Sequence, residues 1–406
     1  MSRALNRCLT IKMNKYINYL FVIYAFLLPI SRSSISILTA LLFVLWLFSN
    51  NFKNKIEFLT SNRIIISLLL FVGFSIISLL WSQAPFGGLQ YIRKYWYFLT
   101  IIVIATAIEK KYLTYAISAF LTGMLISELI SYGIFFELWK FKEATAAFPN
   151  PFMNHPQYSM FLAFTSLLLL SKIFYEKSLN LKILYVLFFL TTTANLFINA
   201  GRTGQVAFAA SIFIVGFLHI KNRFFAFFGM SFMLLVIFFA SYSISPNFKA
   251  RVNVGITDIA KVLSKDDYCS SIGLRLAVWQ IGGEIFIDNP VLGIGVTNDM
   301  EALNESITKK HTNMECAKIM PSYHNFYVQT AVHLGLIGLI LYLSVFYNLL
   351  KLGIKDEFYS NLLVVFVGIY SISSLVETMF HEQFPAAFFA LFTGIFIAQK
   401  RIESEV

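Results

Sequence analysis

Three side chains have the type and setting to do chemistry: Arg202, Arg275 and His324. Arg202 lies in the sequence Asn199-Ala-Gly-Arg-Thr-Gly204, a tight break between two apolar stretches. Glycine allows a sharp turn and the close approach of a ligand, and such a break in a membrane is tolerated only where it lines a cavity or water. An arginine at a membrane edge is costly without a partner, so a functional role is expected. A plain hairpin with a snorkelling arginine is the alternative.

Arg275 stands four residues before Trp279, on one face of a predicted amphipathic helix. The pair Asn289-Pro290 is expected to end that helix, because a residue before proline is pushed out of the helical region. The alternative for Arg275 is a surface ion pair with Asp266 or Asp267. The apolar stripe of the helix is predicted to consist of Leu274, Ala277, Val278, Ile281 and Ile285.

His324 stands at the mouth of the apolar run 325–349, where it could be a catalytic histidine or a hydrogen-bonded structural residue. His155 is a second histidine at the start of a predicted helix, after the proline-rich turn that begins at Pro149. His381 and Glu382, just before the last apolar run, are expected on the same side of the membrane.

The sequence predicts no metal site and no cofactor. It has neither an HExxH motif nor paired Cys/His spacing, and the pair Asp266-Asp267 lacks the pattern of a dedicated cation loop. Cys269 and Cys316 share one long loop and could form a disulfide in an oxidising compartment. Sequence alone leaves this pairing open, because it does not establish proximity.

The elements that position these residues are predicted to be transmembrane helices. The chain of 406 residues is 58% hydrophobic and only 13% charged, far below the charged fraction of a soluble domain. The fold class is therefore all-α, a polytopic integral membrane protein with about twelve transmembrane helices and one large external loop containing short helices. The expected spans are 17–30, 34–50, 64–81, 97–108, 113–136, 158–171, 183–198, 205–219, 224–244, 325–349, 358–376 and 385–399.

Charge asymmetry predicts the topology. With the N-terminus in the cytoplasm, about 18 Lys and Arg fall in short cytoplasmic loops and about 6 in short external ones. Both termini are then cytoplasmic, and the net charge of +11 reflects these loops rather than nucleic-acid binding. The six external residues need another explanation, which is function or contact with anionic lipid; they are Arg32, Arg93, Lys94, Lys140, Lys142 and Arg202.

Three regions follow from this topology. Residues 1–244 are expected to form about nine N-terminal transmembrane helices, and 325–406 about three C-terminal ones. Between them, 245–324 is the only long polar segment, and we expect it to be an external loop that carries catalytic elements.

The motifs in their order resemble the O-antigen ligase/polymerase superfamily of bacterial envelopes. The most specific is His324-Asn325-Phe-Tyr-Val-Gln329 leading into Gly335-Leu-Ile-Gly338, and Glu382-Gln383 also resembles a segment of some ligases. The resemblance covers roughly residues 60 to 400. The other motifs that carry it are Asn154-His155-Pro156, Gly201-Arg202-Thr203-Gly204, Arg275 to Trp279 and Asn289-Pro290-Val-Leu-Gly293-Ile-Gly295.

The resemblance implies an inverting glycosyltransferase that needs no metal, in the bacterial inner membrane, with the large external loop as a periplasmic loop that carries the active site. The donor would be a glycan on undecaprenyl diphosphate and the acceptor lipid A-core, with membrane lipids around them. Arg202 and Arg275 would stabilise the leaving diphosphate, and His324 would be the general base or orient the acceptor. The implied substrate-binding residues are Asn325, Trp279, His155 and Tyr323.

Two other functions stay open at this stage. A repeat-unit polymerase of the same superfamily would use the same residues, with a second carrier-linked glycan as its acceptor. A transporter is the third reading, but transporters usually show internal repeats and charged residues within their spans. The sequence shows no convincing repeat, and its charges cluster in loops.

Overall fold

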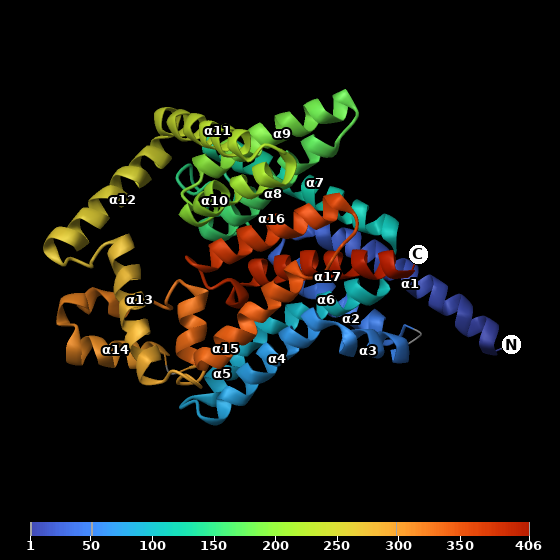
Figure 1. The fold of residues 1–406 in the computed structure, drawn as a ribbon, viewed down its shortest axis with the longest axis horizontal. Coiled ribbons are helices and arrows are strands. Elements are labelled where there is room, and N and C mark those ends of the chain that lie inside the picture. The colour runs from blue at the N-terminus through green and yellow to red at the C-terminus, as the bar shows by residue number, and fades with distance from the viewer. Residues whose placement is uncertain (1, 50–51, 298, 406) are drawn as a thin grey trace.

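The computed structural model describes residues 2–49, 52–297 and 299–405, with side chains from residue 13 onward. Throughout these ranges the chain forms helices and no β-strand. Two groups of helices flank a separate unit near the middle of the chain (Figure 1). The first group comprises α1 (Ser2–Leu27), α2 (Arg32–Leu47), α3 (Phe52–Ser61), α4 (Arg63–Ile77), α5 (Pro85–Ile92), α6 (Leu99–Ala107), α7 (Lys110–Phe135), α8 (His155–Tyr175), α9 (Leu179–Ile198), α10 (Arg202–His219) and α11 (Arg223–Ile244).

The second group is α15 (Phe326–Leu350), α16 (Glu357–Ser374) and α17 (Gln383–Glu405), which pack among the first to make one bundle. Each of the twelve predicted spans overlaps one helix of this bundle. By length and composition, seven helical segments in the described ranges are able to cross a membrane. They are Arg63–Leu80, Lys110–Phe135, His155–Tyr175, Leu179–Ile198, Arg223–Ile244, Phe326–Leu350 and Glu357–Ser374.

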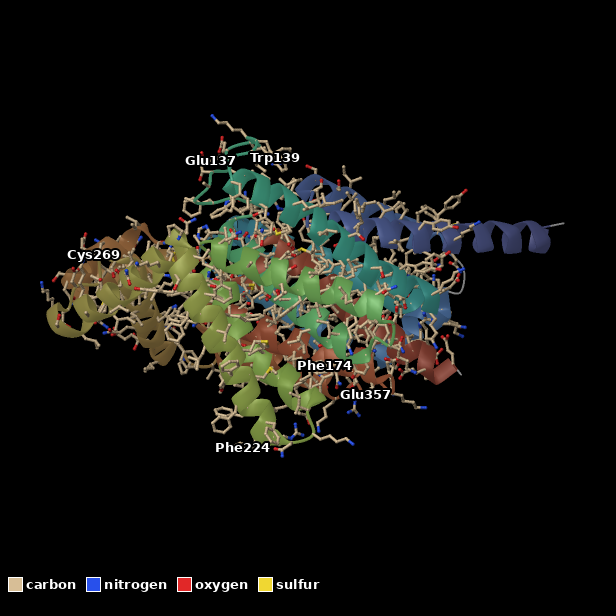
Figure 2. All side chains as sticks on the ribbon, turned by 90° about the horizontal axis from the view of Figure 1, so that it is seen from above. Glu137, Trp139, Phe174, Phe224, Cys269 and Glu357 are labelled. Atoms are coloured by element: carbon tan, nitrogen blue, oxygen red, sulfur yellow. A yellow bond between two sulfur atoms is a disulfide. The ribbon has the colours of Figure 1, made fainter. Side chains whose placement is uncertain are left out.

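The helices of the bundle differ in how much of their surface is buried. The apolar window of α8 is 78% buried, whereas that of α11 is only 11% buried, so α8 is a central helix and α11 a peripheral one. Helix α17 is buried along residues 383–399. The exposed phenylalanines of α11, such as Phe224 in Figure 2, are those expected of a lipid-facing surface.

Helices α12 (Pro246–Lys265), α13 (Ser271–Asp288), α14 (Asp299–Lys310) and the 3₁₀ helix η3 (Thr312–Ile319) form a unit that we call the cap. The cap projects from one end of the bundle, opposite the start of α1 (Figures 1 and 2). It has its own small hydrophobic core, and the predicted stripe of α13 supplies much of it: Ala277, Val278, Ile281 and Ile285 are buried, with Leu274 partly buried beside them. The helix ends at Asp288, as the following Asn289-Pro290 predicted.

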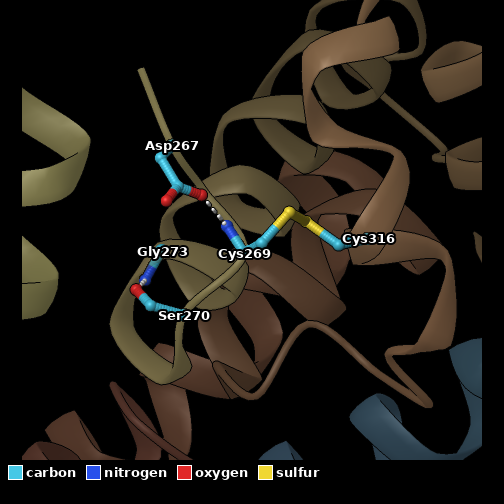
Figure 3. The surroundings of a disulfide bond; sticks show 5 residues. All are labelled: Asp267, Cys269, Ser270, Gly273 and Cys316. Atoms are coloured by element: carbon cyan, nitrogen blue, oxygen red, sulfur yellow. Dashed lines mark hydrogen bonds between the residues drawn. A yellow bond between two sulfur atoms is a disulfide. The ribbon is translucent and has the colours of Figure 1, made fainter. Parts of the chain in front are cut away.

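A disulfide between Cys269 and Cys316 fastens the cap (Figure 3). Cys269 lies just before α13, where its backbone N–H donates to the Asp267 carboxylate, and Cys316 lies in η3. The bond joins residues 47 apart in the sequence. It therefore ties the start of α13 to the segment that leads into His324.

Candidate active site

A cavity of about 590 Å³ lies where the cap meets the bundle. Its walls combine Arg275 from the cap, His155 from the start of α8, His324 from the approach to α15, and the segment after α16. Two predicted catalytic residues, separated by 49 positions in the sequence, therefore face the same space. Other residues that line the cavity include Tyr91, Asp299, Gln329, Glu377, His381 and Glu382.

Glu377 joins the two predicted catalytic residues. One carboxylate oxygen accepts from the Arg275 guanidinium at 3.3 Å, and the other lies 3.2 Å from Nδ1 of His324. The Glu377 side chain is only 12% exposed, against 23% and 24% for its two partners. Arg275 thus pairs with a carboxylate across the cavity and not with Asp266 or Asp267, which were the alternatives from sequence.

His324 has an unusual backbone. Its φ is +45°, in the left-handed region that residues other than glycine rarely adopt. The backbone N–H donates to the Ser322 hydroxyl, and the next residue, Asn325, caps α15 by accepting from the N–H groups of Tyr327 and Val328. Such a conformation persists only where the surroundings impose it, and it is concentrated at functional sites.

Three hydrogen bonds fix Tyr323, the residue before His324. Its carbonyl accepts from Trp279 Nε1 at 2.7 Å, its N–H donates to the Gln329 side chain, and its hydroxyl donates to the Asp299 carbonyl. Tyr323 is fully buried and lines no part of the cavity. Trp279, Tyr323 and Asn325, which were expected to bind substrate, do not line this cavity, and their hydrogen bonds lie around the backbone on either side of His324.

Arg202 lines a smaller cavity of about 40 Å³ that shares His155 and Arg275 with the larger one. It begins α10, directly after Gly201. A Cβ on Gly201 or Gly204 would come within 2.5 Å of the backbone of α8, so these glycines let the two helix starts meet. The motifs around His155 and Arg202 are therefore two halves of one helix contact.

The guanidinium of Arg202 is only partly satisfied. Nη2 donates to the carbonyl of Arg251 at 2.9 Å, while Nη1 is buried and has no hydrogen-bond partner in the described chain. Arg251 itself, from α12, lines the same small cavity together with Arg275. Three arginines and the positive end of α10 therefore converge here, which is an arrangement suited to an anion.

Gly293 and Gly335 hold the cap against α15. Both have a positive φ, of +67° and +63°. A Cβ on Gly293 would lie 2.5 Å from the backbone of His333, and one on Gly335 would lie 2.3 Å from the carbonyl of Val291. The helix kinks at Gly335 as a result. The two glycine motifs seen in the sequence are thus the two sides of one close contact between the cap and α15.

One wall of the cavity, which we call the far wall, contains His381 and Glu382. Its polar side chains are neutral or acidic. Burial, with His333 and Lys94 nearby, lowers the pKa of His381 well below its usual range, so its imidazole is neutral. Burial raises the pKa of Glu382, whose carboxylate accepts from the Gln157 amide at 2.7 Å. The aromatic ring of Tyr91 packs on His381, with ring centroids 3.5 Å apart.

Sequence reasoning missed Glu377 and Arg251. Glu377 is the first charged residue after the predicted span 358–376 and lies on the side expected for the site, which is the signal that could have identified it. Arg251 stands among other charged residues of α12 and had no distinguishing pattern. Within the described ranges, no group of three or more His, Cys, Asp or Glu is arranged to hold a metal ion.

Comparison with known families gives a match to part of the chain. A family described as O-antigen ligase matches residues 186–343, a segment that includes Arg202, Arg275 and His324 but not His155 or Glu377. None of the curated proteins compared with the chain matches it. Over this segment the chain is similar to the O-antigen ligase family, which supports the resemblance of its motifs to the O-antigen ligase/polymerase superfamily.

Proposed function

We propose that the protein is an O-antigen ligase. It transfers a glycan from undecaprenyl diphosphate to a sugar hydroxyl of lipid A-core. The observation that carries this proposal is the convergence of Arg275, Glu377 and His324 on one cavity, beside the unpartnered Nη1 of Arg202. A cation cluster next to a histidine–carboxylate pair is what glycosyl transfer from a diphosphate requires.

The arginines receive the leaving diphosphate. When the bond between the anomeric carbon and the phosphate oxygen breaks, its electron pair and a negative charge pass to the diphosphate. Arg202 has a free buried donor, and Arg275 uses only one of its five N–H donors on Glu377. Both guanidinium groups can therefore bind the diphosphate as it leaves. Fixed cations at this position supply the stabilisation for which other enzymes use a divalent metal, so we propose a metal-independent reaction.

His324 acts as the general base. Donation from Nδ1–H to Glu377 fixes the tautomer in which Nε2 carries the free electron pair. Nε2 then takes the proton of the acceptor hydroxyl while that oxygen attacks the anomeric carbon from the face opposite the diphosphate. The configuration at this carbon is inverted, and the proton passes from the imidazole to solvent.

The membrane placement follows the charge pattern of the loops. We propose that the twelve bundle helices that overlap predicted spans cross the bacterial inner membrane, with both termini in the cytoplasm and the cap and cavity in the periplasm. The disulfide of the cap belongs in that oxidising compartment.

Deletion of the gene tests this function, with lipopolysaccharide and carrier-linked glycan extracted from the same cells. A ligase predicts a core that bears no glycan, while long polymer accumulates on the carrier. A core that carries a single repeat unit would identify the protein as a polymerase. An unchanged ladder would refute both activities.

A further inference from the structure

An apolar groove of about 370 Å³ lies on the outside of the bundle, between α4, the 3₁₀ helix η2 (Arg93–Phe98) and α6. It lies where the predicted span 97–108 is irregular: α6 has only nine residues and is preceded by six in 3₁₀ conformation. The groove walls are almost entirely hydrocarbon. They include Leu68, Leu69, Val72, Trp96, Leu99 and Ile102.

One cation stands at this groove. Arg93 is the first residue of η2 and is exposed, and its side chain makes no hydrogen bond or ion pair with the described chain. It belongs to the small set of basic residues that oppose the charge bias of the loops. An apolar groove combined with an unpaired guanidinium matches a ligand with a hydrocarbon chain and an anionic head group.

The groove is adjacent to the active-site cavity. Tyr91 lines the cavity and Tyr95, one helical turn later, lines the groove. His381 lies between them, with ring centroids 3.5 Å from Tyr91 and 5.5 Å from Tyr95. A lipid in the groove would therefore have its head group at the edge of the cavity.

The groove and the arginine cluster lie on different sides of the molecule. Figure 1 shows α4 and α5 on the opposite side of the bundle from α10 and α12, which carry Arg202 and Arg251. In an inverting transfer the acceptor must attack from the face opposite the leaving group. The lipid-borne substrate that arrives along the groove is therefore the acceptor and not the diphosphate carrier.

We propose that this groove seats an acyl chain of the lipid A anchor of the acceptor, with Arg93 paired to its phosphate. This inference rests on the proposed ligase function. In this arrangement the donor lipid and the acceptor lipid bind at two different walls of one cavity, and they do not compete for the same site. An acylated, phosphorylated glycolipid fits both the hydrocarbon walls and the cation.

Acceptor kinetics with reconstituted protein test the assignment. Leu69→Trp fills the groove, and we expect it to raise the KM for lipid A-core about tenfold, because about two methylene groups lose their site. Arg93→Gln should raise it about fivefold. Neither substitution should change the KM for the carrier-linked donor. Leu69→Trp and the wild-type protein should also use core oligosaccharide freed of its acyl chains equally well.

Two matched variants serve as controls. Leu70→Trp changes a neighbouring leucine of α4 with similar exposure, 53% against 57%, that does not line the groove. Lys140→Gln removes an exposed cation elsewhere. A rise in the donor KM instead would assign the groove to the carrier and overturn the proposal. Equal effects of Leu69→Trp and Leu70→Trp, or of Leu69→Trp on acylated and deacylated acceptor, would also overturn it.

Binding of lipid A alone, measured by native mass spectrometry, separates this inference from the proposed function. Retention by wild type and loss in Leu69→Trp would support the groove, even if the wild-type protein transferred no glycan. Equal retention by both, or by neither, would overturn the groove assignment whatever the transfer assay shows.

Discussion

Replacing Glu377 by glutamine should disable the reaction while leaving the fold intact. The site presents two donors to this side chain, Arg275 Nη2 and His324 Nδ1, at 3.3 and 3.2 Å. A glutamine amide has only one acceptor oxygen, so one contact is lost and the other is no longer charge-assisted. The lost contact is worth about 1.5 kcal/mol at these long distances, and the contact that remains loses about a third of that with its charge assistance. The sum of about 2 kcal/mol corresponds to a loss of about thirtyfold in rate.

The assay is glycan transfer by purified protein at saturating donor and acceptor. Because Glu377 positions the base, the loss should appear in kcat, with both KM values within about threefold of wild type. Glu284→Gln is the matched control, since Glu284 also pairs with a histidine, His311 at 2.8 Å, but away from the cavity. A Glu377→Gln protein with wild-type kcat, or a loss no larger than that of the control, would refute the assigned role.

Three further predictions concern the cation cluster, the disulfide and the far wall. Arg202→Lys keeps the charge but loses the planar fork, so kcat should fall at least tenfold; a wild-type rate would contradict bidentate binding of the diphosphate. Serine at both Cys269 and Cys316 should cost up to about 4 kcal/mol of cap stability, from a closed loop of 47 residues. A lower melting temperature would show this loss, and an unchanged value under oxidising conditions would argue against the bond. Burial raises the folded-state pKa of Glu382, so its stabilising contribution is complete at acid pH and is lost as pH rises through that pKa. Glu382→Gln should therefore raise the melting temperature at pH 7 and leave it unchanged near pH 4; a larger gain at pH 4 would contradict the sign.

Much of the helical layout was predictable because it follows from local patterns. Every predicted span overlaps a helix, and the buried face of α13 is the one that the apolar spacing indicated. Proline after Asn289 marked the end of that helix correctly. These features depend on a few neighbouring residues, and hydrophobic periodicity records them directly.

The partners of the site residues were not predictable, because they come from distant parts of the chain. Glu377 meets His324 across 53 positions and Arg275 across 102. Gly293 and Gly335 looked like separate turn signals, yet their function is mutual close packing. Trp279 and Tyr323 were predicted to contact substrate, but neither lines the cavity, and the Trp279 indole donates to the carbonyl of Tyr323, the residue before His324. Local sequence gives the residue type, and the tertiary fold decides what it touches.

Reconstituted transfer between two defined lipids tests the central claim most directly. Purified protein in lipid nanodiscs receives glycan on undecaprenyl diphosphate together with lipid A-core. We predict glycosylated lipid A-core and an equal amount of released carrier diphosphate, with both products abolished in Arg275→Gln. If lipid A-core stayed unmodified while the carrier-linked glycan grew longer, the protein would be a polymerase and the claim would be contradicted.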